Sequence, residues 1–431
     1  MTATATAPPE VAGLIAEAEQ LLRQRDAAAA LALLQRAQAL QPGNLLALWH
    51  QAVARRDLGD MPGALADARL LVARAKPASK ADVLLGSLCI HAGHYEEALS
   101  WLDRALRRDP ADATARLNRG IALLSLGEIA AGLDDYEARW DGAMAGMYLR
   151  GPAETRLRRG ENLAGRRVLL HWEQGFGDTL QFCRYAPILA AQGAEVTLVV
   201  RPPQQALLQH SLGRCGIRVL ADGTRLPACD RHGLMISAML ACGTTLATIP
   251  GNVPYLFADA VAVARWRRRL RALAPLSRLA VGFAWAGHAE HSNDRNRSIP
   301  LAAMLPLMAM PGLLAVSLQR ELRPGDAALL TALPQLPRPI ETMEDFAETA
   351  ALVAALDLVV TVDTAIAHLA GALGVPCCIL LPLRADWRWL QDRADTPWYP
   401  AARLFRQRRG GDWTPVLREL QAHLGARLQA P

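Results

Sequence analysis

The sequence has few aromatic residues, no long apolar run and no cysteine pattern. Aromatic residues make up 5% of the 431 positions and hydrophobic residues 52%, so alanine and leucine must fill the cores, which favours helix. No apolar stretch reaches the ~18 residues needed to cross a bilayer, and the first residues lack the basic and apolar parts of a secretory signal. The seven cysteines are scattered, which predicts buried, reduced thiols and a cytoplasmic protein.

Several catalytic motifs are also missing. The chain has no Walker A sequence, no G-x-S-x-G and no D-x-D pair of aspartates. The pairs His91/His94 and His288/His291 are interpreted as solvated loop histidines, so we predict no metal site and no cofactor. The net charge of +6 is carried by arginine. It permits an anionic ligand or membrane surface but does not call for nucleic acid.

The first third of the chain repeats with a period of about 34 residues. Pro42, Pro77 and Pro110 each close a helical stretch. Small and aromatic packing residues recur in register at Gly86, Gly93, Tyr95, Ala98 and Ala105, and then at Gly120, Gly127, Gly132 and Tyr136. The pattern resembles the tetratricopeptide repeat, with the first two copies degenerate. About four repeats over residues 10–140 predict an α-solenoid that binds a protein partner on its concave face or, alternatively, only packs on the next domain.

Beyond a predicted linker at residues 141–163, strands and helices alternate. Apolar runs predict a first α/β half, residues 164–274, with parallel strands at 168–171, 195–200, 218–221 and 234–236. They predict a second half, residues 275–425, with strands at 279–285, 313–318, 356–362 and 377–381 and a C-terminal helix. Because parallel α/β sheets bind ligands at the carboxyl ends of their strands, two such halves imply a site between them.

The most informative segment of the second half runs from Asp363 to Leu369, between an apolar strand and a small-residue helix that stops at Gly374. The start of such a helix presents free N–H groups and a positive dipole end, which suits a diphosphate. Thr364 and His368 lie four positions apart and face the same side of the first turn. A plain cap and a structural histidine explain the spacing equally well.

A second turn, His171–Thr179, lies between a strand and a helix in the first half. Gly175 and Gly177 permit a tight turn and close approach of a ligand, although the third glycine of the dinucleotide motif is absent. Asp178 stands near the helix start, where it either caps the helix or supplies a catalytic carboxylate.

These strings resemble glycosyltransferase family 9, the heptosyltransferase-like enzymes, and the chain as a whole is similar to bacterial tetratricopeptide-repeat glycosyltransferases. The matching strings lie at residues 172–182, 293–300, 317–319, 363–376, 386–389, 396–400 and 403–407. The resemblance implies a GT-B fold of two Rossmann-like halves, with the acceptor toward the first and the donor in the second. It also implies metal-independent transfer from a nucleotide-diphosphate sugar, in agreement with the missing D-x-D.

The residues and the resemblance together define a candidate site. Asp178 is predicted to be the base that deprotonates the acceptor, a role that typically contributes roughly 10²–10⁴-fold to the rate. Arg297 is predicted to contact the donor phosphates. The other predicted donor-side residues are Asp363, Thr364, Ala365, His368, Gln319, Trp285 and Gly287.

We therefore predict an inverting glycosyltransferase with a protein or glycan acceptor, whose repeats recruit the acceptor or a partner protein. Two alternatives stay open: a non-catalytic scaffold with a nucleotide-sugar-binding or degenerate transferase domain, and heptosyl-type transfer to lipopolysaccharide, for which repeats are not expected. The basic segment Arg265–Arg271 is interpreted as a solvated face near the domain junction or, alternatively, as a peripheral contact with anionic membrane lipid.

Overall fold

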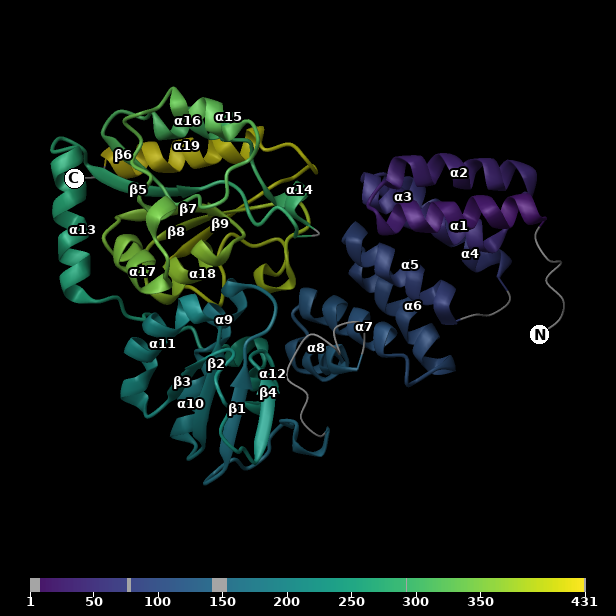
Figure 1. The fold of residues 1–431 in the computed structure, drawn as a ribbon, viewed down its shortest axis with the longest axis horizontal. Helices are drawn as coiled ribbons and strands as arrows, with labels where there is room; N and C mark the ends of the chain where they lie inside the picture. The colour runs from purple at the N-terminus through teal and green to yellow at the C-terminus, as the bar shows by residue number, and fades with distance from the viewer. Residues whose placement is uncertain (1–7, 76–78, 142–152, 292, 430–431) are drawn as a thin grey trace. The chain divides into compact units, whose positions relative to one another are not determined.

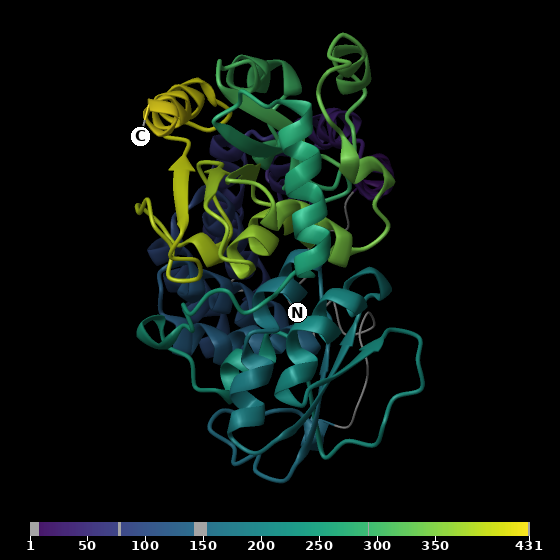
Figure 2. The same ribbon diagram turned by 90° about the vertical axis from the view of Figure 1, so that its left-hand side faces the viewer.

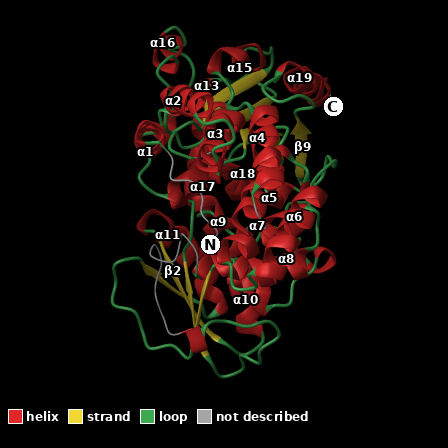
Figure 3. Cartoon of the chain, turned by 90° about the vertical axis from the view of Figure 1, so that its right-hand side faces the viewer, coloured by secondary structure: helices red, strands yellow, loops and turns green. Residues whose placement is uncertain are grey.

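The computed structural model describes residues 8–75, 79–141, 153–291 and 293–429. It divides into two compact units, Met1–Gly146 and Met147–Pro431. Among the described residues, the first unit contains helices but no strands, and the second contains both helices and strands (Figure 3). The predicted tail at the start of the chain and much of the predicted linker lie outside the described residues. The α-helical first unit and the parallel-sheet second unit confirm the predicted fold class.

The described part of the first unit contains four pairs of α-helices, in agreement with the predicted number of repeats, and a 3-10 helix, Glu137–Trp140, follows them. The helices are α1 (Pro9–Arg23), α2 (Ala27–Leu40), α3 (Leu45–Leu58), α4 (Met61–Arg74), α5 (Ser79–Ala92), α6 (Tyr95–Arg108), α7 (Ala113–Ser125) and α8 (Ile129–Tyr136). Small residues let the paired helices approach closely. A Cβ at Gly86 would lie 2.7 Å from Cγ of Leu102, and one at Gly120 would lie 2.7 Å from the backbone N of Tyr136.

One backbone turn recurs in every repeat, between its two helices. Arg25, Gly59, Gly93 and Gly127 each follow the previous one by 34 residues, and all have left-handed backbones with φ of 67°, 84°, 75° and 85°. The first two repeats, which look degenerate in sequence, therefore share the geometry of the later ones. In the first repeat this geometry is forced on an arginine, although glycine adopts it at much lower cost.

The first half of the second unit is a four-stranded parallel sheet in the order β3-β2-β1-β4. Its elements are β1 (Arg167–His171), α9 (Phe176–Phe182), α10 (Tyr185–Ala191), β2 (Glu195–Val200), α11 (Gln205–Leu212), β3 (Arg218–Ala221), β4 (Arg231–Leu234) and α12 (Ser237–Ala241). The strand predicted at 234–236 is misplaced. The pairing partners of Leu169 and Leu170 are His232 and Gly233, so β4 begins earlier, in a polar stretch that an apolar pattern does not mark.

The second half is a five-stranded parallel sheet in the order β6-β5-β7-β8-β9. Its strands are β5 (Leu279–Ala284), β6 (Leu313–Ser317), β7 (Leu358–Val362), β8 (Cys377–Leu381) and β9 (Ala402–Arg406). Its helices are α14 (Asp294–Arg297), α15 (Leu301–Met308), α16 (Asp326–Thr331), α17 (Phe346–Ala354), α18 (Ala365–Ala372) and α19 (Thr414–Gln429), and α13 (Ala260–Leu273) precedes them.

Helices cover both faces of the second sheet. Figure 1 shows α15, α16 and α19 on one side and α17 and α18 on the side toward α9 of the first half. Figure 2 shows α13 as a long helix on the outside of the second half. Val281 and Phe283 of β5, and Trp285 just after the strand, lie in one apolar core with α15 and α19. This core fixes the strand ends from which the candidate site is built.

The predicted burial of the cysteines is correct for four of them, Cys89, Cys183, Cys377 and Cys378. Cys215 is exposed, so the prediction is wrong there. Among the described helices, none combines the length and the low charge of a segment that crosses a bilayer.

Replacing Arg25 by glycine is expected to stabilise the repeat unit by about 1 kcal/mol, because a left-handed backbone costs a residue with a side chain roughly that much. The matched control is Gly59→Ala, at the equivalent position of the second repeat. A Cβ there meets no atom within 4 Å, so a loss of similar size is expected from the backbone alone. Denaturant unfolding followed by far-UV circular dichroism measures both changes. Shifts of the same sign in the two variants would contradict a shared turn.

Candidate active site

The predicted donor residues lie at the carboxyl ends of neighbouring strands. β5 and β7 pair along Val281–Ala284 and Leu358–Thr361 at the centre of the second sheet. The chain leaves β5 at Trp285 and β7 at Asp363, so both following loops begin at the same edge. This edge is where parallel α/β sheets place their ligands.

Arg297 spans these two loops. Its guanidinium NH1 donates to the backbone O of Asp363 at 2.9 Å, and its side chain is 12% exposed. The guanidinium lies over Gly287, where a Cβ would come within 2.4 Å of NH2, so a side chain at this position would displace the guanidinium. The buried Nε has no hydrogen-bond partner within the described chain. Arg297 thus places a positive charge, with one N–H group that forms no hydrogen bond within the described chain, beside the loop that follows β7.

The side chain of Asp363 carries a perturbed carboxyl group. Burial raises its pKa to about 6, and the neighbouring carboxylate of Asp386 adds to the rise, while Arg297 and Arg388 oppose it. This carboxyl group therefore titrates close to neutrality, which is a common property of functional sites.

The next residue, Thr364, is the N-cap of α18, but its side chain does not cap the helix. Its hydroxyl lies 3.1 Å from that of Thr361, which in turn donates to the backbone O of Val362 at 2.8 Å. Thr364 and Ala365 are half-buried at the start of α18. The side chain of Thr364 therefore leaves the first N–H groups of this helix without a cap.

Asp178 reaches the same region from the first half. It stands in the first turn of α9, where its Oδ2 accepts the N–H of Gly175 at 2.8 Å. Its Oδ1 accepts from the guanidinium of Arg388, a residue of the second half. Burial raises the pKa of the Asp178 carboxyl, while Arg388 and the Gly175 N–H oppose the rise. Asp178 is thus a cap and one half of an ion pair at once.

Arg388 is a site residue that the sequence did not single out by itself. It lies in the short helix η7 (Trp387–Trp389) and is 5% exposed. Besides Asp178, it donates to Oε1 of Gln181 at 2.9 Å and to Oδ1 of Asp386 at 2.7 Å. In the sequence, residues 386–389 are noticeable because they resemble family 9. Their distance along the chain from Asp178 gives no indication that the two segments meet.

Gly177 brings α9 against α18. A Cβ on Gly177 would lie 2.7 Å from Cδ2 of His368 and 3.5 Å from Cα of Ala365, so a larger residue would push the helices apart. His368 itself is buried, with Nδ1 2.9 Å from the hydroxyl of Tyr399 and its ring stacked on Trp389 at 5.4 Å. Burial, with Arg388 and Arg184 nearby, holds its pKa well below the ordinary value. The structure thus gives this neutral histidine a packing role beside the site.

Two predicted pocket residues lie in the interior. Trp285 is fully buried and donates through Nε1 to Oδ2 of Asp326 at 2.9 Å. Oε1 of Gln319 accepts the N–H groups of Trp285 and Ala286, both at 2.9 Å, and Nε2 donates to Ala286 O and Glu321 O. Because these bonds use the polar atoms of both side chains, the two residues support the loop after β5 from behind. A single sequence cannot separate such support from direct contact.

Within the described part of the chain, no three His, Cys, Asp or Glu residues cluster in a way that could hold a metal ion. His288 instead pairs with Glu321, with Nδ1 to Oε1 at 2.8 Å.

Two family models match parts of this chain. The model described as glycosyltransferase family 9 (heptosyltransferase) matches residues 341–380. This segment spans α17, β7 and α18, and therefore includes Asp363, Thr364, Ala365 and His368. The model described as tetratricopeptide repeat matches residues 15–80 and 83–146.

Among curated proteins, the chain is similar to protein FlbA of Caulobacter vibrioides, with 26% identity over 413 residues. The match covers 91% of this chain but only 63% of FlbA, so the chain spans less than two thirds of that relative.

Similar solved structures include helical-repeat proteins. A thermophilic TPR protein in Thermus thermophilus is 26% identical over 30% of this chain and 73% of its own, with a TM-score of 0.29. MamA 41-end from Desulfovibrio magneticus RS-1 is 19% identical over 32% of this chain and 77% of its own, also with a TM-score of 0.29. The family matches and the fold together show a glycosyltransferase-like protein with tetratricopeptide repeats.

The pKa of Asp363 predicts a pH dependence of stability. A carboxyl group whose pKa is higher in the folded than in the unfolded chain lowers stability as it ionises. Stability should therefore fall as pH rises from about 4, the unfolded value, to about 6, the folded value. Asp363→Asn should remove this loss and exceed the wild type by about 1–2 kcal/mol above pH 6.

Denaturant unfolding at a series of pH values measures this difference. Asp395→Asn is the matched control, because Arg393 lowers the pKa of that exposed carboxyl instead. Parallel stability curves for the wild type and Asp363→Asn would show that this carboxyl group is not perturbed.

Proposed function

We propose that the second unit transfers a sugar from a nucleotide-diphosphate donor to a hydroxyl group of a protein or glycan acceptor. One observation carries the proposal: the glycine turn of the first half and the strand-end loops of the second half meet around Arg388. Arg388 donates to Asp178 of the first half and to Asp386 of the second, and in the pKa of Asp363 the charge of Asp386 raises the value while that of Arg388 lowers it. Carboxylates, arginines and open helix starts are the groups that such a transfer needs.

The donor diphosphate is assigned to the start of α18 and to Arg297. The helix start offers N–H groups and the positive end of a dipole, and the Thr364 side chain leaves them uncapped. Arg297 adds a guanidinium whose buried Nε forms no hydrogen bond within the described chain, although it lies 3.9 Å from Oδ1 of Asp294. Arginine binds phosphate through paired, charge-assisted hydrogen bonds. The family 9 match falls on this same segment, which supports the assignment.

Asp178 is assigned as the base. The acceptor hydroxyl loses its proton to a carboxylate oxygen of Asp178 as its oxygen bonds to the anomeric carbon. The bond from that carbon to the diphosphate oxygen breaks, and the nucleoside diphosphate leaves with the electron pair. A single displacement of this kind inverts the anomeric centre.

The ion pair with Arg388 must loosen for this chemistry, because an arginine bound to a carboxylate makes it a weaker base. A donor diphosphate provides a competing anion for the guanidinium. We therefore expect donor binding to draw Arg388 from Asp178 toward the phosphates, which frees the base only when a donor is present. Such coupling would limit the reaction to the complete complex.

The repeats are assigned to recruitment of an acceptor protein or a partner protein. Helical repeat arrays bind protein segments across several repeats, and no candidate catalytic residue comes from this unit. A non-catalytic scaffold is the second candidate, and the observation that favours it is the same ion pair, which occupies Asp178 in this structure.

Asp178→Asn is expected to lower turnover by roughly 10²-fold or more, because it removes the base. The amide oxygen still accepts the Gly175 N–H, so folding and donor binding should stay intact. The matched control is Asp386→Asn, which removes a carboxylate partner of the same Arg388 but not the base. Initial rates with a competent acceptor test this assignment, and equal losses in both variants would reduce Asp178 to an ion-pair partner.

Arg297→Ala is expected to weaken nucleotide-diphosphate binding by about 1–3 kcal/mol, since it removes a charge-assisted hydrogen bond. Arg295→Ala, on the same short helix but exposed, is the control and should bind normally. Calorimetric titration with UDP, GDP and ADP measures this change and also identifies the nucleobase that the donor site prefers. An affinity that is the same in both variants would remove Arg297 from the site, and no binding of any nucleotide would contradict the proposed donor.

A further inference from the structure

The helix α13 connects the two halves of the second unit and leaves most of its surface exposed. Trp266 and Leu270 are buried, and they hold the helix against the second half. Nε1 of Trp266 donates to Oε1 of Glu348 on α17 at 2.7 Å, and Arg265 pairs with the same carboxylate. These contacts fix one face of α13 against α17, and the guanidinium of Arg267 also donates to the backbone O of Ala354 at 3.3 Å.

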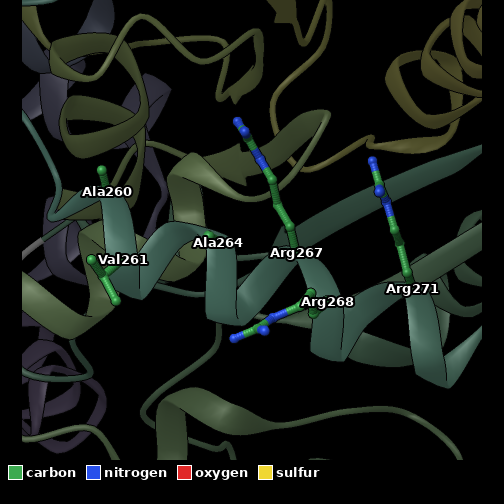
Figure 4. A pocket seen from close by; sticks show the side chains of 6 residues that line it. All are labelled: Ala260, Val261, Ala264, Arg267, Arg268 and Arg271. Carbon is green, nitrogen blue, oxygen red and sulfur yellow. The ribbon is translucent and has the colours of Figure 1, made fainter.

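Six exposed residues of α13 line a shallow hollow of about 630 Å³. They are Ala260, Val261, Ala264, Arg267, Arg268 and Arg271. In Figure 4, Arg267 and Arg271 extend from the helix in the same direction, while Arg268 and Val261 point to another side. The alanines keep the first turns of the helix narrow, and the arginines project beyond them.

The positive charge on α13 is not balanced inside the protein. The helix has five arginines and no carboxylate of its own. Only Arg265 forms an ion pair within the described chain. Arg267 and Arg271 lie four positions apart and Arg268 and Arg271 three, and like charges at these spacings destabilise a helix. An anion from outside the chain would relieve this repulsion.

Exposed aliphatic side chains occur at both ends of the same helix. The three most exposed large hydrophobic side chains in the described chain are Val261, Leu273 and Leu276, at 76%, 55% and 94%. Val261 lies in the first turn, Leu273 is the last residue and Leu276 follows three positions later. These aliphatic side chains therefore flank the arginines along the helix.

We propose that α13, together with Leu276, docks on an anionic lipid bilayer. Arginines bind lipid phosphates while aliphatic side chains enter the boundary below the headgroups, and a bilayer offers both in one plane. Nucleic acid would use the arginines but not the aliphatic groups, and the only aromatic ring on the helix, Trp266, is buried. This docking is independent of the proposed transfer reaction, because none of these residues belongs to the candidate site.

Sedimentation of the full chain with lipid vesicles tests the proposal. The chain should bind vesicles of equal parts phosphatidylcholine and phosphatidylglycerol but not vesicles of phosphatidylcholine alone, and salt should weaken the binding. Replacing Arg267, Arg268 and Arg271 together by glutamine should lower the affinity on the order of 100-fold. This figure follows from the favourable binding free energy that each cation contributes near an anionic surface.

The matched control replaces three other exposed arginines, Arg408, Arg409 and Arg418, by glutamine, with the same change in net charge. It should bind the vesicles much more tightly than the first triple variant. A separate double variant, Val261→Ser with Leu276→Ser, should bind several-fold more weakly at a salt concentration that screens the arginines. Thermal melting confirms that each variant is folded.

Three outcomes would overturn the proposal. The first is equal binding to neutral and anionic vesicles. The second is the same affinity in the two triple variants, which would assign the binding to net charge alone. The third is a preference for single-stranded DNA or polyglutamate over anionic vesicles that disappears when the α13 arginines are replaced, since the surface would then serve a polymeric anion.

Discussion

The guanidinium of Arg388 joins the two halves of the α/β unit at the candidate site. It bonds to Asp178 and Gln181 of the first half and to Asp386 of the second, and it lies 4.7 Å from the ring centre of Trp387. A buried cation is costly unless all its donors are paired. The positions of the candidate base and of the loop around Asp386 therefore depend on one another through this single group.

A second buried arginine strengthens the same junction through neutral oxygen atoms and aromatic rings. Arg184 donates to the backbone O of Pro250 and Trp398 and to the hydroxyl of Tyr255, and its charge lies 4.9 Å from the ring centre of Tyr399. Carbonyl oxygens and aromatic faces stabilise a cation but do not neutralise it. Arg184 thus places at this junction a buried positive charge that no ion pair neutralises within the described chain, whereas Arg388 is paired with two carboxylates.

Sequence reasoning reached the local features and missed the long-range ones. The turn from β7 into α18 could be predicted because an apolar strand, a polar turn and a small-residue helix leave distinct local patterns. Arg388 could not, because its partner Asp178 lies 210 positions away. β9 was not predicted, since Arg403 and Arg406 interrupt its apolar pattern. Gln319 shows a further limit, because a polar residue after a strand looks the same whether it contacts a ligand or the backbone behind it.

The left-handed turns at residues 25, 59, 93 and 127 also bear on how such a chain can change during evolution. Each turn restores the backbone to the same starting geometry, so a whole repeat can be duplicated or lost without altering its neighbours. A shorter insertion within a repeat would break the register of every later packing contact. The number of repeats, and with it the length of the array, can therefore change when a segment of the gene is duplicated or lost, while the α/β unit stays unchanged.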